Sequence, residues 1–137
     1  MAVILDSDAV VGFLDRSDAL HEAADAAIRK LAAKQPILVS VITYAEVITG
    51  VRLGHHDDVR VSGFFTEVIS RIVPVSVEIA DRAAELRVRS KALKMPDALI
   101  VASAETEPEV DLLLSGDRDL ANLRGLHCKV RLLSASG

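Results

Sequence analysis

Apolar residues along the chain form short runs that alternate with longer helical repeats, and polar or proline-containing segments separate them. The runs cover residues 2–5, 37–41, 72–75, 112–114 and 130–133, and their length and β-branched content are typical of buried strands. Between these runs, apolar residues recur every three or four positions, as they do on one face of a helix. The pattern predicts the element order β-α-α-β-α-α-β-α-α-β-α-β.

Strands that alternate with helices indicate an α/β fold, with three layers (α/β/α) around a central parallel sheet of four to five strands. Ser17 and Ser76 are expected to cap two of the helices, and Pro96 is expected to lie in the first turn of another. The length of 137 residues is common for one domain, so we expect a single domain over residues 1–137.

The composition narrows the class of protein. Half of the residues are apolar but only 3% are aromatic, so the core must be aliphatic, which suits helices packed on a parallel sheet. The first apolar run has no basic leader and ends at Asp6, and no run approaches the roughly 20 residues of a membrane span, so we expect neither a signal peptide nor a membrane segment. Cys128 is the single cysteine, which favours a reducing, cytoplasmic location.

Four acidic residues follow predicted strands or open predicted helices: Asp6, Glu46, Asp97 and Asp117. Functional groups of parallel sheets gather beyond the carboxyl ends of the strands, so these residues are candidates for one site. Each also has a local explanation. Asp6 fits a helix cap, Glu46 fits a capping box with Thr43, Asp97 fits the helix dipole, and Asp117 fits a turn.

Taken together, four carboxylates on one rim would repel one another unless a cation neutralised them. Ligands that are all oxygen select Mg²⁺ or Mn²⁺, and the sequence has no His or Cys spacing suited to zinc. Such a cation enables water to attack phosphorus, so the expected reaction is phosphodiester hydrolysis. We expect Asp6 and Asp97 to be the principal metal ligands, Asp117 to complete the metal site, and Glu46 to hold or deprotonate the water.

Four segments resemble those of the PIN-domain family in order and spacing: Val3–Asp8, Ser40–Val47, Pro96–Ile100 and Leu114–Leu120. No single segment is specific, but the ordered set spans nearly the whole chain. The resemblance implies an endoribonuclease that depends on Mg²⁺ or Mn²⁺, of the VapC type, acting as the toxin of a bacterial toxin–antitoxin pair. It also implies a small antitoxin that covers the acidic site, a homodimer, and a structured RNA substrate such as tRNA or rRNA.

The chain departs from the family pattern at several positions. Asp8 stands where Asn, Ser or Thr is more frequent, so it either adds a carboxylate to the site or caps the helix. Asp119 competes with Asp117 for the last acidic position. Ser115 replaces the usual Thr and keeps its hydroxyl, and Leu120 replaces a common Phe.

Two other functions fit the same residues. The segment from Leu5 to Asp8 also resembles the motif of haloacid dehalogenase-type phosphatases, in which Asp6 would be a covalent nucleophile, although those enzymes need a downstream Lys and usually a cap domain. Alternatively, the chain is a binding module that keeps the fold without catalysis.

Several surface features permit two interpretations. The net charge of −4 opposes broad attraction to RNA, yet the basic cluster from Arg82 to Lys94 either follows an RNA backbone or forms a solvated helix face. His55 and His56 are either an acid–base pair or part of a surface loop. The aromatic residues Tyr44, Phe64 and Phe65 either stack on bases or belong to the core.

Overall fold

The computed structural model describes residues 1–135, so the last two residues of the predicted domain lie outside it. The strands are Ala2–Leu5 (β1), Ile37–Ser40 (β2), Arg71–Val73 (β3), Val110–Ser115 (β4) and Lys129–Leu132 (β5). The helices are Ser7–Leu14 (α1), His21–Ala32 (α2), Val41–Arg52 (α3), Asp58–Glu67 (α4), Val77–Arg89 (α5), Met95–Thr106 (α6) and Arg118–Ala121 (α7). Their order along the chain is the predicted one.

The five strands form one parallel sheet in the order β3-β2-β1-β4-β5, which confirms the predicted α/β architecture. β1 lies at the centre, where Leu5 is in register with Val39 of β2 and Leu114 of β4. The carboxyl ends of these three strands therefore meet at one edge of the sheet.

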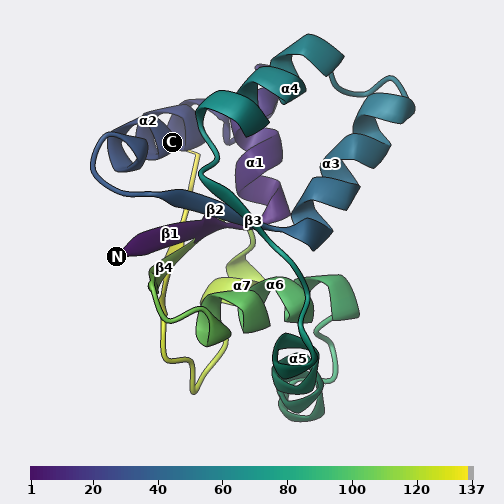
Figure 1. The fold of residues 1–137 in the computed structure, drawn as a ribbon, viewed down its shortest axis with the longest axis vertical. Helices are drawn as coiled ribbons and strands as arrows, with labels where there is room; N and C mark the ends of the chain where they lie inside the picture. The colour runs from purple at the N-terminus through teal and green to yellow at the C-terminus, as the bar shows by residue number, and fades with distance from the viewer. Residues whose placement is uncertain (136–137) are drawn as a thin grey trace.

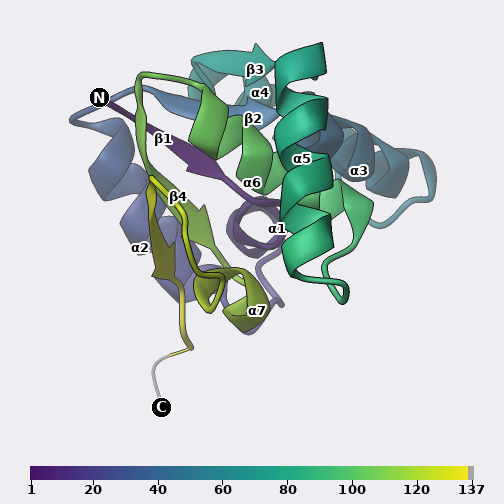
Figure 2. The ribbon, with the colours of Figure 1, turned by 90° about the horizontal axis from the view of Figure 1, so that it is seen from below.

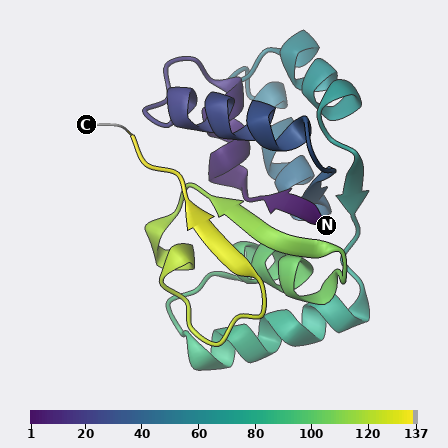
Figure 3. The same ribbon diagram turned by 90° about the vertical axis from the view of Figure 1, so that its left-hand side faces the viewer.

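Helices cover both faces of the sheet (Figure 1). Helices α1 to α4 lie on one face and α5 to α7 on the other, and the views in Figures 2 and 3 show the same layers from two other sides. Alternate residues of β1 supply the two faces, because Ile4 packs in the core beneath α5 and α6 while Val3 and Leu5 pack beneath α1 and α2. None of the helices in residues 1–135 has the length and apolarity needed to cross a lipid bilayer.

The helix starts test the predicted caps. Ser76 caps α5 by accepting a hydrogen bond from the Ile79 N–H, and Pro96 lies in the first turn of α6, as predicted. The prediction that Ser17 caps the next helix is wrong, because α2 begins at His21. Ser17 instead donates its backbone N–H and its hydroxyl to the Asp15 carboxylate, which holds the segment in a turn.

Candidate active site

Asp6 lies at the carboxyl end of β1, where it is 2% exposed. Its Oδ1 atom accepts a hydrogen bond of 2.8 Å from the Ala9 N–H, so Asp6 caps α1 as its local explanation predicted. The carboxylate also faces β4, where it accepts hydrogen bonds from the Ser115 hydroxyl and the Gly116 N–H. Burial raises the pKa of Asp6 to about 6, although these hydrogen bonds favour the charged form.

Gly116 allows β4 and α1 to approach closely. A Cβ atom at this position would lie 2.8 Å from both the Asp8 Cβ atom and the Leu20 Cδ1 atom, which is closer than such atoms pack. A side chain here would therefore push apart the two segments that carry Asp8 and Asp117.

The structure brings Asp8, Glu46, Asp97 and Asp117 within electrostatic reach of one another. Burial raises the pKa of Asp97, and so do the charges of Asp117, Glu46 and Asp8. Burial and the charges of Asp117, Asp18 and Glu46 raise the pKa of Asp8. Three of the predicted site residues, Glu46, Asp97 and Asp117, thus gather at the carboxyl edge of the sheet beside the fourth, Asp6.

Glu46 does not form the capping box that its spacing from Thr43 suggests. Helix α3 begins at Val41 and is capped by Ser40, which places Glu46 beyond the first turn. The Glu46 carboxylate is instead held by the Ser7 hydroxyl, which lies 2.6 Å from its Oε1 atom. The sequence analysis did not identify Ser7 as a site residue, and the one available signal was a hydroxyl directly after Asp6.

A pocket of about 480 Å³ opens beside these carboxylates. Its walls come from the turn between α5 and α6, the first turn of α6 and the segment of α7: Ser90, Ala92, Leu93, Lys94, Asp97, Asp117, Asp119, Leu120 and Leu123. The pKa of Asp97 is raised on balance by burial and the neighbouring carboxylates, and the positive charge of Lys94 offsets part of this increase. Asp119 lines the pocket and donates its backbone N–H to Asp117 Oδ1. Asp8 instead lies close to the carboxylates of Asp117 and Glu46, whose charges raise its pKa together with burial.

The donor set fits a hard divalent cation. Its side chains offer oxygen atoms and carry several negative charges in a partly buried place. Within residues 1–135, no three acidic, His or Cys side chains are placed to ligate one ion together. This spacing is compatible with Mg²⁺, which keeps several of its waters and commonly binds one or two carboxylates directly.

Other candidates from the sequence lie elsewhere. His55 and His56 line a separate pocket of about 380 Å³ beside Leu14, at the opposite end of α1 from Asp6. The aromatic rings pack on one another, with centroids 5.0 Å apart for Tyr44 and Phe65 and 5.4 Å apart for Phe64 and Phe65. The core interpretation therefore holds for Phe64, which is 2% exposed, whereas Tyr44 is 37% exposed and packs on Phe65 at the surface. His55 and His56 lie in a loop away from the carboxylates, which favours the loop interpretation.

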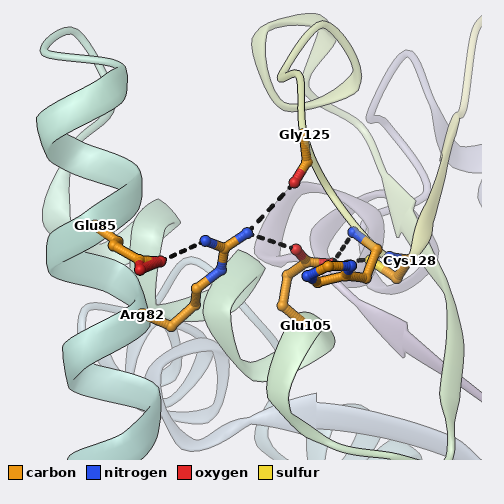
Figure 4. A network of polar contacts seen from close by, with 6 residues as sticks. Arg82, Glu85, Glu105, Gly125 and Cys128 are labelled. Atoms are coloured by element: carbon orange, nitrogen blue, oxygen red, sulfur yellow. Dashed lines mark hydrogen bonds and ion pairs between the residues drawn. The ribbon is translucent and has the colours of Figure 1, made fainter.

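Two members of the basic cluster are engaged within the fold. Arg82 forms ion pairs with Glu85 and Glu105, and Arg87 donates a hydrogen bond to the Leu93 carbonyl. Figure 4 shows the Arg82 network, which also includes the segment before β5. In that segment, burial and the neighbouring Glu105 raise the pKa of the Cys128 thiol to about 12, so the thiol stays neutral.

A sequence profile of the PIN domain matches residues 3–126. The chain belongs to the PIN-domain family. A search of curated protein sequences found no match.

Several solved structures share the fold of the chain. The VapBC2 complex of Rickettsia felis bound to a promoter DNA fragment contains a chain that matches with a TM-score of 0.77 and 18% identity, covering 98% of this chain and 100% of that one. A toxin–antitoxin complex of Klebsiella pneumoniae matches with a TM-score of 0.68 and 25% identity, covering 98% and 99%. VapC20 of Mycobacterium tuberculosis, a toxin that cleaves the sarcin–ricin loop, matches with a TM-score of 0.64 and 19% identity, covering 88% and 95%.

These comparisons confirm the predicted resemblance to PIN domains of the VapC type. The match to the PIN-domain profile also weakens the phosphatase alternative.

Proposed function

We propose that this PIN domain is an endoribonuclease that depends on Mg²⁺ or Mn²⁺ and acts as the toxin of a toxin–antitoxin pair. The observation that carries the proposal is the gathering of acidic side chains beside the buried Asp6, where burial and the charges of Asp117 and Glu46 raise the pKa of both Asp8 and Asp97. Carboxylates gathered in this way destabilise an empty site, and a bound cation offsets the repulsion. The pocket beside them gives a phosphodiester room to approach.

The residues take distinct roles in the proposed reaction. Asp6, Asp97 and Asp117 would hold the cation, one or two of them directly and the rest through its bound waters, and the cation would lower the pKa of water and neutralise charge on the phosphate oxygens. Glu46 orients a water molecule and accepts its proton as the water attacks phosphorus. The bond from phosphorus to the 3′ oxygen breaks, so the products are a 5′-phosphate and a 3′-hydroxyl.

The test measures cleavage of total tRNA and rRNA by the purified protein, freed of any partner, with Mg²⁺, with Mn²⁺ and with EDTA. We expect cleavage only with a divalent cation, and we expect Asp97→Asn to reduce it by about 100-fold or more. Folding should be retained, because a neutral side chain at position 97 relieves the repulsion that raises the pKa of Asp97.

Asp111→Asn is the matched control. Asp111 is exposed near the amino end of β4, at the opposite edge of the sheet, so its loss should leave cleavage unchanged. Cyclic phosphate products would refute attack by water. RNA binding of equal strength with and without Mn²⁺, with no cleavage under either condition, would support a binding module instead.

The proposal extends to partners and location. The solved relatives include toxin–antitoxin complexes, which supports a small cognate antitoxin for this chain as well, in the cytoplasm. We also propose a homodimer, for which large apolar side chains such as Val77 and Val88 are available on the surface. Co-expression with the product of a short upstream gene tests the antitoxin, and light scattering of the purified toxin tests the dimer.

A further inference from the structure

Ser7 joins α1 to α3, the helix that carries Glu46. Its hydroxyl lies 2.6 Å from Glu46 Oε1 and 3.1 Å from Thr43 Oγ1, and both of these partners belong to α3. Ser7 is itself the first residue of α1 and directly follows Asp6. One side chain therefore spans from the end of the central strand to the helix that carries Glu46.

The hydroxyl of Ser7 has a single proton for these two oxygens. A charged carboxylate is the stronger acceptor, and 2.6 Å is typical of a hydroxyl that donates to a carboxylate. The proton therefore goes to Glu46, and the neighbouring Thr43 side chain, which is fully buried, fixes the position of the Ser7 oxygen.

Glu46 depends on this contact for its orientation. It is exposed, and among residues 1–135 the Ser7 hydroxyl is the one hydrogen-bond donor to its side chain. A free glutamate side chain samples many rotamers, and confining it costs conformational entropy. The bond to Oε1 confines the side chain and leaves Oε2 available to the site.

We infer that Ser7 is a positioning residue that holds the Glu46 carboxylate in its working orientation for phosphodiester hydrolysis. This inference rests on the proposed function, because it concerns the residue that would accept the proton from water. The juxtaposition also links Glu46 to Asp6, since the first turn of α1 bonds both carboxylates, through the Ser7 hydroxyl to Glu46 and through the Ala9 N–H to Asp6.

Ser7→Ala should reduce kcat by about tenfold and weaken Mn²⁺ binding by a similar factor, as is usual when a residue that orients a metal-site group is lost. KM should change little, because a positioning role for Ser7 affects the chemical step and leaves RNA binding as it was. Ser7→Thr keeps the hydroxyl and should restore most of both properties. Thermal unfolding should show that each variant is folded.

Ser17→Ala is the matched control. Ser17 also donates its hydroxyl to a carboxylate, at 2.7 Å from Asp15 Oδ1, but at the far end of α1. Its loss should leave both kcat and Mn²⁺ affinity unchanged.

A double-mutant cycle tests whether Ser7 acts through Glu46. In a Glu46→Gln background, Ser7→Ala should cause no further loss of kcat or Mn²⁺ affinity. Losses that simply add would overturn the positioning role, and so would a Ser7→Ala protein equal to the wild type. If the wild-type protein neither binds Mn²⁺ nor cleaves RNA, the proposed function itself is overturned together with this inference.

Discussion

Replacing Glu105 with alanine should destabilise the protein far more than replacing Glu85, although both carboxylates pair with Arg82. The Glu105 side chain is 1% exposed, and it accepts hydrogen bonds from Arg82 at 2.9 Å, from the His127 N–H at 2.7 Å and from the Cys128 N–H at 2.8 Å (Figure 4). It thereby ties α5 and α6 to the segment before β5. The Glu85 side chain is 58% exposed and bonds only to Arg82 among the described residues.

The size of the effect follows from these contacts. Removing one partner of a buried ion pair typically costs about 3–5 kcal/mol, because the other partner loses its compensation. Arg82 keeps Glu85 after the Glu105→Ala change, so we expect a value of about 3 kcal/mol, at the lower end of that range. For a domain of this size the melting temperature should fall by about 10 °C. An exposed pair contributes about 0–1 kcal/mol, which is the loss expected for Glu85→Ala.

Urea unfolding followed by circular dichroism measures both free energies, and this signal suits a chain without tryptophan. The effect of pH provides a second readout. Burial alone favours the neutral acid, but the hydrogen bonds from Cys128, Arg82 and His127 outweigh it and lower the pKa of Glu105. The stabilisation is therefore complete above the ordinary glutamate pKa and is lost as the pH falls through the lowered value.

The free-energy difference between wild type and Glu105→Ala should accordingly shrink in strong acid. The reasoning is refuted if Glu105→Ala costs no more than Glu85→Ala at neutral pH, because burial of the carboxylate would then have no energetic consequence.

Two further predictions concern the site. Burial raises the pKa of Asp6 to about 6, so without divalent cations the folded state favours the neutral acid. The free energy of unfolding that depends on this neutral form is complete below pH 4, and about 3 kcal/mol of it is lost as the pH rises through 6. Asp6→Asn should remove this part of the pH dependence in urea unfolding at pH 4 to 7.5, and an unchanged dependence would contradict the assignment. Gly116→Ala should cost about 1–3 kcal/mol and reduce cleavage, because the new methyl group meets Asp8 and Leu20, whereas Gly63→Ala, which meets no atom within 4 Å, should have little effect on cleavage.

The strands and their order along the chain could be predicted from sequence, because short apolar, β-branched runs are typical of strands buried on both faces of a parallel sheet. The run at residues 2–5 coincides with β1, and the others differ from their strands by one or two residues at one or both ends. Helix starts were harder to predict. Ser17 and Thr43 are both residue types that often cap helices, but neither does so here. Asp15 accepts the Ser17 N–H and Ser40 accepts the Ile42 N–H, so neighbouring side chains bond the local backbone instead.

In the candidate site, too, some residues could be predicted from the sequence and others could not. Asp6, Asp97 and Asp117 could be placed from the sequence because each lies where a strand ends or a helix begins. The bond from Ser7 to Glu46 joins residues that are 39 positions apart, and no local pattern reports a contact of that kind. Whether Asp8 joins the acidic residues likewise needed three-dimensional proximity, because no local pattern shows that its carboxylate lies near those of Glu46, Asp97 and Asp117.

The pairing of β1 with β4 has a consequence for how the protein is made. The central strand is synthesised before its neighbour β4, and the Ser115 hydroxyl that bonds Asp6 lies 109 positions further along the chain. Until β4 and Asp117 have been synthesised, β1 has no partner on that side and the group of acidic residues is incomplete. Nascent or prematurely released fragments therefore lack a complete set of acidic groups, and the order of translation itself delays the completion of this group.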